Sequence, residues 1–267
     1  MHIKLHAAIS YLLLSLLLQP VWAASAALQF DSGPRPVALL EMFSSQGCSS
    51  CPAAERWMST LKQDPRLWRQ LVPVVFHVDY WDYLGWRDPF ASMKHSQRQR
   101  RYHLHQRCKA VYTPGFMLAG SEWRDWFNRR ELPTDLPGHL SNQVPKAAFG
   151  FSTASTSTSD VGRLKIEVEN GQYSARFIRN ADNRGLVFNI ALLGFDQVTD
   201  IGSGENRGRR LPQDFVVLVH HTETADKPMW KGSLPASPLP GKKAVAFWVS
   251  HGNDPAPLQA TGGWLPE

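Results

Sequence analysis

The sequence has few cysteines, few long apolar runs and none of the common nucleotide or hydrolase motifs. Only 3 cysteines occur in 267 residues, which excludes a small fold held together by many disulfides. Beyond residue 26, no stretch is apolar enough to predict a membrane-spanning helix. The absence of G-x-x-x-x-G-K, H-E-x-x-H and G-x-S-x-G elements leaves no support for a P-loop, a zincin protease or an α/β-hydrolase nucleophile.

What remains is the composition of an ordinary globular protein. Charged residues make up 19% and aromatic residues 11% of the chain, which argues against collagen, coiled coil or wholesale disorder. The formal net charge is +6. This charge favours solubility and anionic partners, but it does not imply nucleic-acid binding.

The first residues have the features of a secretory signal. Lys4 precedes a short apolar run at 7–18, and then come Pro20 and the small residues at 23–26. We therefore predict a signal peptide at 1–26, a periplasmic or secreted protein, and no membrane span after cleavage. The alternative is an uncleaved anchor, for which this apolar run is short.

The part of the chain at 36–148 alternates between strand and helix patterns, after a leader at 27–36. The expected strands lie at 37–43, 71–78 and 116–119, and the expected helices at 48–63, 91–109 and 121–128. Pro52 falls in the first helical turn, where its missing N–H costs little. This order predicts an α/β layer structure with some parallel pairing.

The second part of the chain has a strand pattern throughout. The polar, low-complexity segment at 152–159 marks a boundary, and the β domain is expected at 160–267. The expected strands lie at 164–168, 173–178, 186–193, 215–219 and 244–249. Asn170-Gly171 between two alternating runs predicts a hairpin, and the part as a whole is expected to be an antiparallel, sandwich-like β domain.

Cys48 and Cys51 form a C-x-x-C pair between an expected strand and an expected helix. Because a helix start carries unpaired N–H groups and partial positive charge, it favours a thiolate over a thiol. We expect an accessible Cys48 to attack a disulfide, and Cys51 to resolve the mixed disulfide. Two alternatives stay open: a permanent disulfide that pins the helix start, and a copper site formed by both sulfurs and one histidine. Cys108 is interpreted as a buried small hydrophobe, with a mixed disulfide as its alternative.

Thr113-Pro114 lies just before the third expected strand, where thioredoxin folds carry a cis-proline. X-Pro bonds tolerate the cis form far better than other peptide bonds. We predict a cis Pro114 facing the cysteines, with Thr113 offering its backbone to an incoming peptide; the alternative is a trans turn proline. The fold class is then an α/β thioredoxin-like N-terminal domain at 36–148, followed by an antiparallel β-sandwich-like C-terminal domain.

Acidic and aromatic residues crowd the segment 77–89. If the strands at 37–43 and 71–78 are parallel neighbours, this segment and the cysteines lie at the same edge of the sheet, where ligands bind. We expect a recognition wall of aromatic rings and a proton relay through His77, Asp79 or Glu41. The candidate binding residues are His77, Asp79, Tyr80, Trp81, Asp82, Trp86 and Tyr112. The alternative is a packed loop in which aspartates cap backbone N–H groups.

Two further segments receive structural interpretations. The basic run at 94–109 is expected to be a solvated helix face, with attraction to an anionic envelope surface as the alternative. The charged segment at 204–209 is expected to be a turn that only connects strands.

Several motifs resemble those of a secreted bacterial family called domain of unknown function 1223: residues 41–52, 77–90, 98–99, 111–114 and 204–209. The resemblance covers nearly the whole mature chain and implies a thioredoxin-like N-terminal domain and an exported protein. It implies no reaction, because the family has no assigned activity. One departure is Gly115, where such proteins usually carry glutamine, and it bears on recognition if that side chain touches the substrate.

Three function hypotheses follow. The first is a thiol–disulfide oxidoreductase that needs no cofactor, acts on exported protein thiols, disulfides or small thiols, and exchanges electrons with a redox partner. Its catalytic residues would be Cys48, Cys51, Thr113 and Pro114. The second is a copper-handling module built on the cysteines and a histidine, and the third is a redox-inert interaction protein. Uncharged Ser49 and Ser50 leave open whether the pair reduces, oxidises or isomerises.

Overall fold

The computed structural model describes residues 27–136, 161–237 and 239–266. The predicted signal peptide at 1–26 and the polar boundary segment at 152–159 lie outside the described residues. Within the described ranges, no helix has both the length and the apolarity needed to cross a bilayer.

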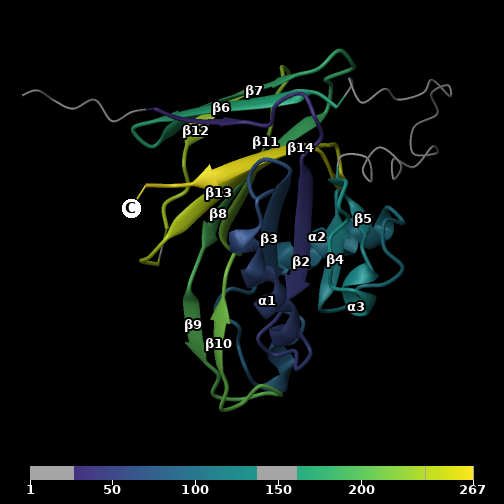
Figure 1. Cartoon of the computed structure of the whole chain (residues 1–267), viewed down its shortest axis with the longest axis vertical. Helices are drawn as coiled ribbons and strands as arrows, with labels where there is room; N and C mark the ends of the chain where they lie inside the picture. Colours follow the sequence, from purple (N-terminus) through teal and green to yellow (C-terminus); the bar gives the residue numbers. More distant parts are fainter. Residues whose placement is uncertain (1–26, 137–160, 238, 267) are drawn as a thin grey trace, which may run out of the picture.

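Strands dominate the described residues, and helices occur in the first part of the chain (Figure 1). The helices are α1 (Cys51–Thr60), α2 (Met93–Leu104) and α3 (Asp125–Asn128), with 3-10 turns η1 (Leu61–Gln63) and η2 (Asp82–Leu84). The strands of the first part are β1 (Leu28–Asp31), β2 (Ala38–Ser44), β3 (Leu71–His77), β4 (Gly115–Leu118) and β5 (Ser121–Glu122). The strands of the second part are β6 (Arg163–Glu169), β7 (Gln172–Ile178), β8 (Leu186–Gly194), β9 (Gln197–Asp200), β10 (Arg210–Gln213), β11 (Val216–Thr224), β12 (Met229–Ser233), β13 (Lys243–His251) and β14 (Asp254–Trp264).

Both parts of the chain contribute strands to one mixed sheet, in the order β14-β13-β8-β11-β3-β2-β4-β5. β2 and β3 are parallel, as predicted, with Ala38 opposite Leu71, and β11 runs parallel to β3. The remaining pairs in this sheet are antiparallel. The prediction of a mixed α/β first part followed by mostly antiparallel strands is therefore confirmed.

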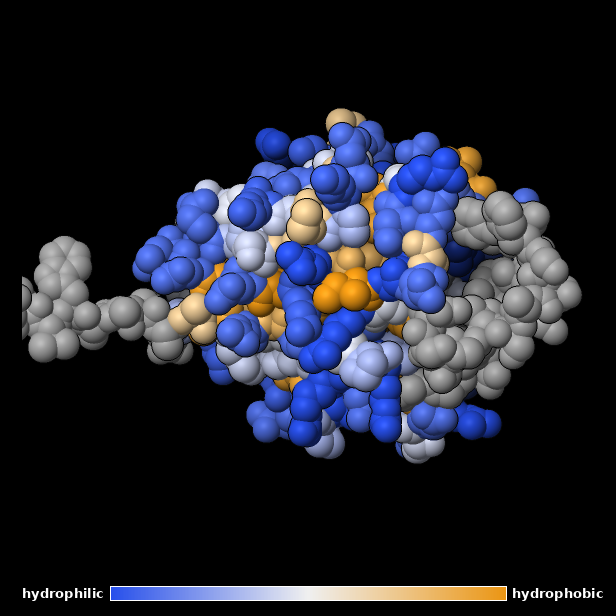
Figure 2. Space-filling model, turned by 90° about the horizontal axis from the view of Figure 1, so that it is seen from above, coloured by the Kyte–Doolittle hydropathy of each residue, from blue (hydrophilic) through white to orange (hydrophobic). Residues whose placement is uncertain are grey.

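The large sheet has a separate apolar core on each face. Side chains alternate between the two faces of a strand, and β13 divides accordingly. Ala246 and Trp248 join the core that includes Met58 of α1. Phe247 and Val249 join the other core, which is closed by the four-stranded sheet β1-β6-β7-β12. The outward positions of β6 and β7 are exposed, and the molecule seen from above is mostly hydrophilic (Figure 2).

One local prediction, a hairpin, is confirmed, and three differ from the structure in their bounds or in the type of element. The predicted hairpin joins β6 to β7 through Asn170 and Gly171, both with positive φ. The expected leader at 27–36 contains β1, because Phe30 is buried in the core of the small sheet. The helix expected at 91–109 ends at Leu104, where Gln106 turns left-handed. The helix expected at 121–128 is replaced in its first part by β5, which pairs with β4.

A two-stranded ribbon, β9 with β10, extends the hairpin that β8 and β11 form within the large sheet. α1 packs against β10. Lys62 anchors the base of the ribbon, because its ammonium group lies 2.8 Å from a carboxylate oxygen of Asp214 and 3.0 Å from one of Asp196. The ribbon therefore brings the loop at 201–209 to the end of the sheet where α1 begins.

Candidate functional site

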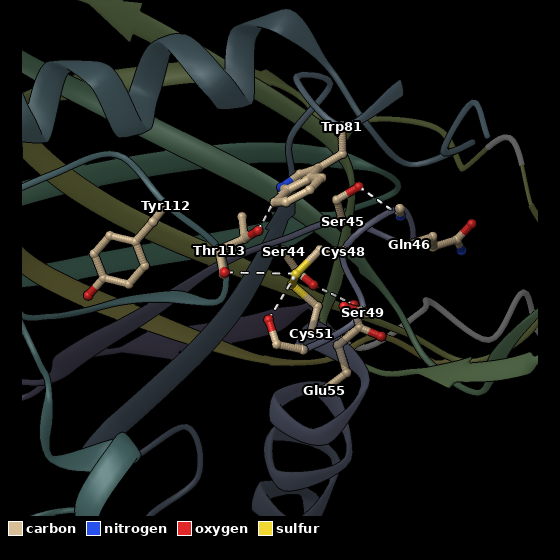
Figure 3. The surroundings of a disulfide bond; sticks show 12 residues. Ser44, Ser45, Gln46, Cys48, Ser49, Cys51, Glu55, Trp81, Tyr112 and Thr113 are labelled. Carbon is tan, nitrogen blue, oxygen red and sulfur yellow. Dashed lines mark hydrogen bonds between the residues drawn. A yellow bond between two sulfur atoms is a disulfide. The ribbon is translucent and has the colours of Figure 1, made fainter. Parts of the chain in front are cut away.

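The cysteine pair lies in the turn that joins β2 to α1 (Figure 3). Cys48 lies in the turn itself, and α1 begins at Cys51, with Pro52 in its first turn. The two sulfurs lie at disulfide distance, and the Cα atoms are 5.5 Å apart. The C-x-x-C spacing next to a helix start thus brings the pair together, as the sequence predicts.

Both cysteines are buried, which corrects the expectation of an accessible Cys48 sulfur. Cys48 retains 1% and Cys51 0% of their exposure. On one side, the carbonyl oxygen of Thr113 lies 3.8 Å from Cys48 Sγ. On another, the side-chain amide of Asn206 donates to the carbonyl oxygen of Cys48 at 2.9 Å. The contact with Asn206 was not predicted because Asn206 lies far from the cysteines in sequence.

The loop before β4 faces Cys48 and is held by hydrogen bonds from two other elements. The Thr113–Pro114 peptide bond is cis, which confirms the prediction. The indole N–H of Trp81 donates to Thr113 Oγ1 at 2.7 Å, and Gln99 Nε2 of α2 donates to the carbonyl oxygen of Tyr112 at 2.6 Å. The carbonyl oxygen of Thr113 is thus fixed beside the sulfur (Figure 3).

Gly115 is required by the close packing of this loop. A Cβ at this position would lie 2.7 Å from the carbonyl oxygen of Tyr112 and 3.1 Å from Gln99 Nε2. A contact below 3 Å with backbone forces the loop to move. The geometry of this loop therefore leaves no room for a side chain at position 115, where the resembling family usually carries glutamine.

Only some residues of the predicted recognition wall turn toward the cysteines. Trp81 does so, while the ring of Tyr112 points away from the disulfide (Figure 3). The other candidate residues form hydrogen bonds with partners other than the cysteines: Tyr112 with Glu122 (2.7 Å), Tyr80 with Gln99 (3.0 Å), Asp79 with Ser96 (2.5 Å), Asp82 with the Asp88 amide (3.3 Å) and Trp86 with Gln46 (2.9 Å). Asp82 thus caps a backbone N–H, as the packed-loop alternative describes.

A buried chain of polar side chains lies beside the disulfide. Ser44 Oγ donates to Glu55 Oε1 at 2.5 Å, a bond drawn next to the sulfurs in Figure 3. His77 Nε2 lies 3.7 Å from the same oxygen, and His77 Nδ1 lies 2.6 Å from Asp88 Oδ2. Within the described residues, Glu55 Oε2 and His77 Nε2 are buried without a hydrogen-bond partner.

The charges in this chain depend on one another. Burial raises the pKa of Glu55. Burial also disfavours a charged His77, but the charge and hydrogen bond of Asp88, together with the charge of Glu55, outweigh this effect and raise the pKa of the imidazole. In turn, the charge and hydrogen bond of His77 lower the pKa of Asp88 in spite of its burial. The chain therefore holds an ion pair next to a carboxyl group that keeps its proton to a higher pH than usual.

Sequence reasoning identified His77 but missed Glu55. The available signal was its spacing, because residues four apart share one face of a helix and Glu55 follows Cys51 by that interval on α1. Glu41, the other relay candidate, belongs elsewhere. Its carboxylate pairs with the buried Arg98 guanidinium at 2.5 Å and accepts a hydrogen bond from Tyr102.

The loop at 201–209 contacts the cysteine turn directly, so the expectation of a turn that only connects strands is wrong. Asn206 Nδ2 donates to the carbonyl oxygens of Gln46 (2.8 Å) and Cys48 (2.9 Å). The carboxylate of Glu205 accepts the backbone N–H of Ser49 at 2.9 Å. Gln46 also reaches the ribbon, since its Nε2 donates to Thr199 Oγ1 at 2.9 Å.

The remaining candidates lie outside this arrangement. Cys108 is half-buried and unpaired with another cysteine in the described ranges; burial and Glu122 raise the pKa of its thiol to about 11. In the basic run, Lys94 and Arg100 are exposed, as predicted, whereas Arg98 is buried. Within the part of the chain that the structure describes, no group of three or more His, Cys, Asp and Glu side chains is arranged to hold a metal ion.

Comparison with known proteins gives a family and a fold. The family model described as a protein of unknown function (DUF1223) matches residues 39–250. A crystal structure of a protein from Agrobacterium tumefaciens, structural-genomics target AtR35, is 21% identical with a TM-score of 0.55, covering 86% of this chain and 94% of that one. HBP35 of Porphyromonas gingivalis is 12% identical with a TM-score of 0.50, covering 86% and 76%. None of the curated proteins compared with the chain matches it.

Proposed function

The chain belongs to the DUF1223 family of proteins of unknown function, and we propose that it is an exported thiol–disulfide oxidoreductase whose active pair is Cys48 and Cys51. The observation that carries this proposal is the position of the Thr113 carbonyl oxygen, 3.8 Å from Cys48 Sγ and just before a cis proline. An extended substrate that pairs with this backbone would present its own disulfide to Cys48.

The fold supports the same proposal. A thioredoxin-like domain would contain a pair of parallel strands, an antiparallel strand pair beside them and a helix that starts at the second cysteine. β2 with β3, β4 with β5, and α1 are consistent with this arrangement. The β1-β6-β7-β12 sheet packs against the large sheet as in a sandwich. The predicted signal peptide at 1–26 supports a periplasmic or secreted location, where exported protein thiols and disulfides are the available substrates.

The reaction balances as a two-electron exchange. The thiolate of Cys48 attacks one sulfur of a substrate disulfide, forming a mixed disulfide and releasing the other sulfur as a thiolate that takes a proton. The thiolate of Cys51 then attacks Cys48 Sγ, and the second substrate thiolate leaves. The substrate is reduced by two electrons and the pair is oxidised by two. A dithiol partner returns the pair to the reduced state by the same exchange.

The second step requires Cys51 to lose its proton although it is fully buried. Burial raises the pKa of a thiol, so a nearby acceptor is needed. Glu55 shares a helix face with Cys51, and Ser44 connects its carboxylate to the surroundings of the disulfide (Figure 3). We assign Glu55 as this acceptor. His77, which is paired with Asp88, lies next to the Glu55 carboxylate.

The proposal is tested by trapping the mixed disulfide. A Cys51→Ser variant should accumulate a covalent adduct with a model disulfide substrate such as oxidised glutathione, because the resolving thiol is gone. A Cys48→Ser variant should form no adduct at 51, and Cys108→Ser should behave as the wild type. Intact-mass spectrometry detects each adduct. If Cys51→Ser forms no adduct under conditions in which unfolded protein does, the pair is redox-inert and the proposal is wrong.

A further inference from the structure

The loop at 201–209 places a carboxylate at the one end of α1 where a negative charge opposes the chemistry proposed for Cys48. Glu205 Oε2 lies 2.9 Å from the backbone nitrogen of Ser49, the residue after Cys48. The side chain of Glu205 is otherwise exposed. Its neighbour Asn206 holds it in position, because Asn206 is fully buried and hydrogen-bonded to the carbonyl oxygens of Gln46 and Cys48.

We propose that Glu205 is a positioning residue that destabilises the thiolate of Cys48 and thereby makes the reduced pair a stronger reductant. This inference rests on the proposed function and adds the direction of the reaction. In a cysteine pair next to a helix start, the free N–H groups of the first turn stabilise the thiolate. Here Glu205 accepts the backbone N–H of Ser49, which lies between Cys48 and the N-cap residue Ser50, and so adds a negative charge at the residue next to Cys48.

The direction in which Glu205 shifts the redox equilibrium follows from the charge of the reduced pair. The disulfide carries no charge, so the negative charge of Glu205 does not repel the oxidised pair. The thiolate of the reduced pair is repelled, and an equilibrium between pair and donor then shifts toward the disulfide. A dithiol that gives up its electrons more readily is a reductant. Glu205 is ionised at neutral pH, because its hydrogen bonds with Ser49 lower the pKa of its carboxyl group.

The other groups around Cys48 do not reverse this sign. The carbonyl oxygen of Thr113 also presents partial negative charge to the sulfur, at 3.8 Å. Ser50 Oγ, at 3.3 Å, is the neighbouring hydroxyl that can donate to a thiolate. Glu55 on α1 lies 3.7 Å from His77 on β3, and Ser44 donates to Glu55 beside the disulfide. In the loop itself, the Arg209 guanidinium donates to Asn206 Oδ1 at 2.7 Å and so holds the amide that anchors Glu205.

The test compares wild type, Glu205→Gln and Asp200→Asn in the full mature chain. Asp200 is a matched control because it is an exposed acid on the same ribbon whose partner is Arg210. The pKa of Cys48 is measured from the pH dependence of iodoacetamide labelling of the reduced protein. The redox equilibrium is measured against glutathione by intact mass, at a pH above the thiol pKa values.

We expect Glu205→Gln to lower the pKa of Cys48 by about half a unit, the size of a single charge effect in the first turn of a helix. The glutathione equilibrium should shift about threefold toward the dithiol. Both effects should shrink in 1 M salt, which screens an exposed charge but would not repair a structural defect. Asp200→Asn should change neither quantity.

An unchanged or higher pKa of Cys48 in Glu205→Gln overturns the inference. If the Cys51→Ser trap still works in that case, the oxidoreductase proposal stands and the assigned role of Glu205 is wrong. If the trap fails in every variant, the oxidoreductase proposal itself is lost, whatever the labelling shows.

Discussion

Replacing Asn206 with alanine should open the cover over Cys48. The Asn206 side chain is 0% exposed, and its amide supplies hydrogen bonds to the carbonyl oxygens of Gln46 and Cys48. A buried polar group left without its partner costs about 1–3 kcal/mol. The Cys48 oxygen keeps the backbone N–H of Cys51 at 3.2 Å, so we expect the closed arrangement of the loop at 201–209 to lose about 1–3 kcal/mol.

This loss should appear as faster chemistry at Cys48. Because Cys48 is 1% exposed, a reagent reaches it through local opening, whose population follows the free energy of the closed state. A loss of 2 kcal/mol raises that population about 30-fold. Iodoacetamide labelling of the reduced protein at constant pH, read by peptide mass spectrometry, measures the rate at Cys48, with Cys108 as an internal reference.

The matched control is Asn189→Ala, which removes another buried amide. Asn189 Nδ2 donates to the carbonyl oxygen of Val187 at 3.1 Å and to Ser250 Oγ at 3.2 Å. This control should lower the free energy of unfolding in urea without accelerating labelling at Cys48. If both variants lose stability and neither labels faster at Cys48, the loop at 201–209 is not its cover, and the explanation given for its burial is wrong.

Three other substitutions test the site and its support. Because Glu55 accepts a proton only when ionised and burial raises its pKa, resolution of a Cys48 mixed disulfide should speed up as pH rises through that raised pKa. Glu55→Gln should abolish this pH dependence and slow the step about a hundredfold in rapid-mixing experiments, whereas an unaltered pH profile would exclude Glu55 as the acceptor. Gly115→Ala places a Cβ 2.7 Å from a backbone oxygen and should cost about 1–3 kcal/mol of unfolding free energy in urea; no loss would mean that the loop relaxes freely. Arg98→Met leaves Glu41 buried without its cation and should cost about 3–5 kcal/mol, most of it recovered when Glu41→Met is added. A double variant as unstable as the single one would refute that account.

The sequence predicted the parts of the site that depend on neighbours along the chain. The apolar runs at 37–43 and 71–78 correspond to strands buried on both faces, and such strands pair in parallel inside a sheet. That pairing alone places Cys48 and the segment 77–89 at one edge. The cis Pro114 followed from its place before the next strand, since the same pattern fixes which loop faces the cysteines.

The orientation of individual side chains could not be predicted, because it depends on tertiary partners. Asp79, Tyr112 and Glu41 have the chemistry of relay or binding groups, and nothing in their local sequence separates them from His77 and Trp81. Their partners do separate them: Ser96 for Asp79, Glu122 for Tyr112, and Arg98 for Glu41. Each of these partners is distant enough in sequence that no helix or strand periodicity connects the pair.

The cover over Cys48 depends on the continuity of the large sheet. β11 pairs with β3, so the hairpin of β8 and β11 stands beside the strands that carry the cysteine turn. The β9–β10 ribbon prolongs that hairpin, and its length sets Asn206 against Cys48. Two parts with separate sheets would give residue 206 no fixed relation to residue 48, whereas one sheet through both gives it a defined one. We therefore expect both parts of the chain to control the reactivity of Cys48, and a substitution in the second part that loosens β11 from β3 should change it.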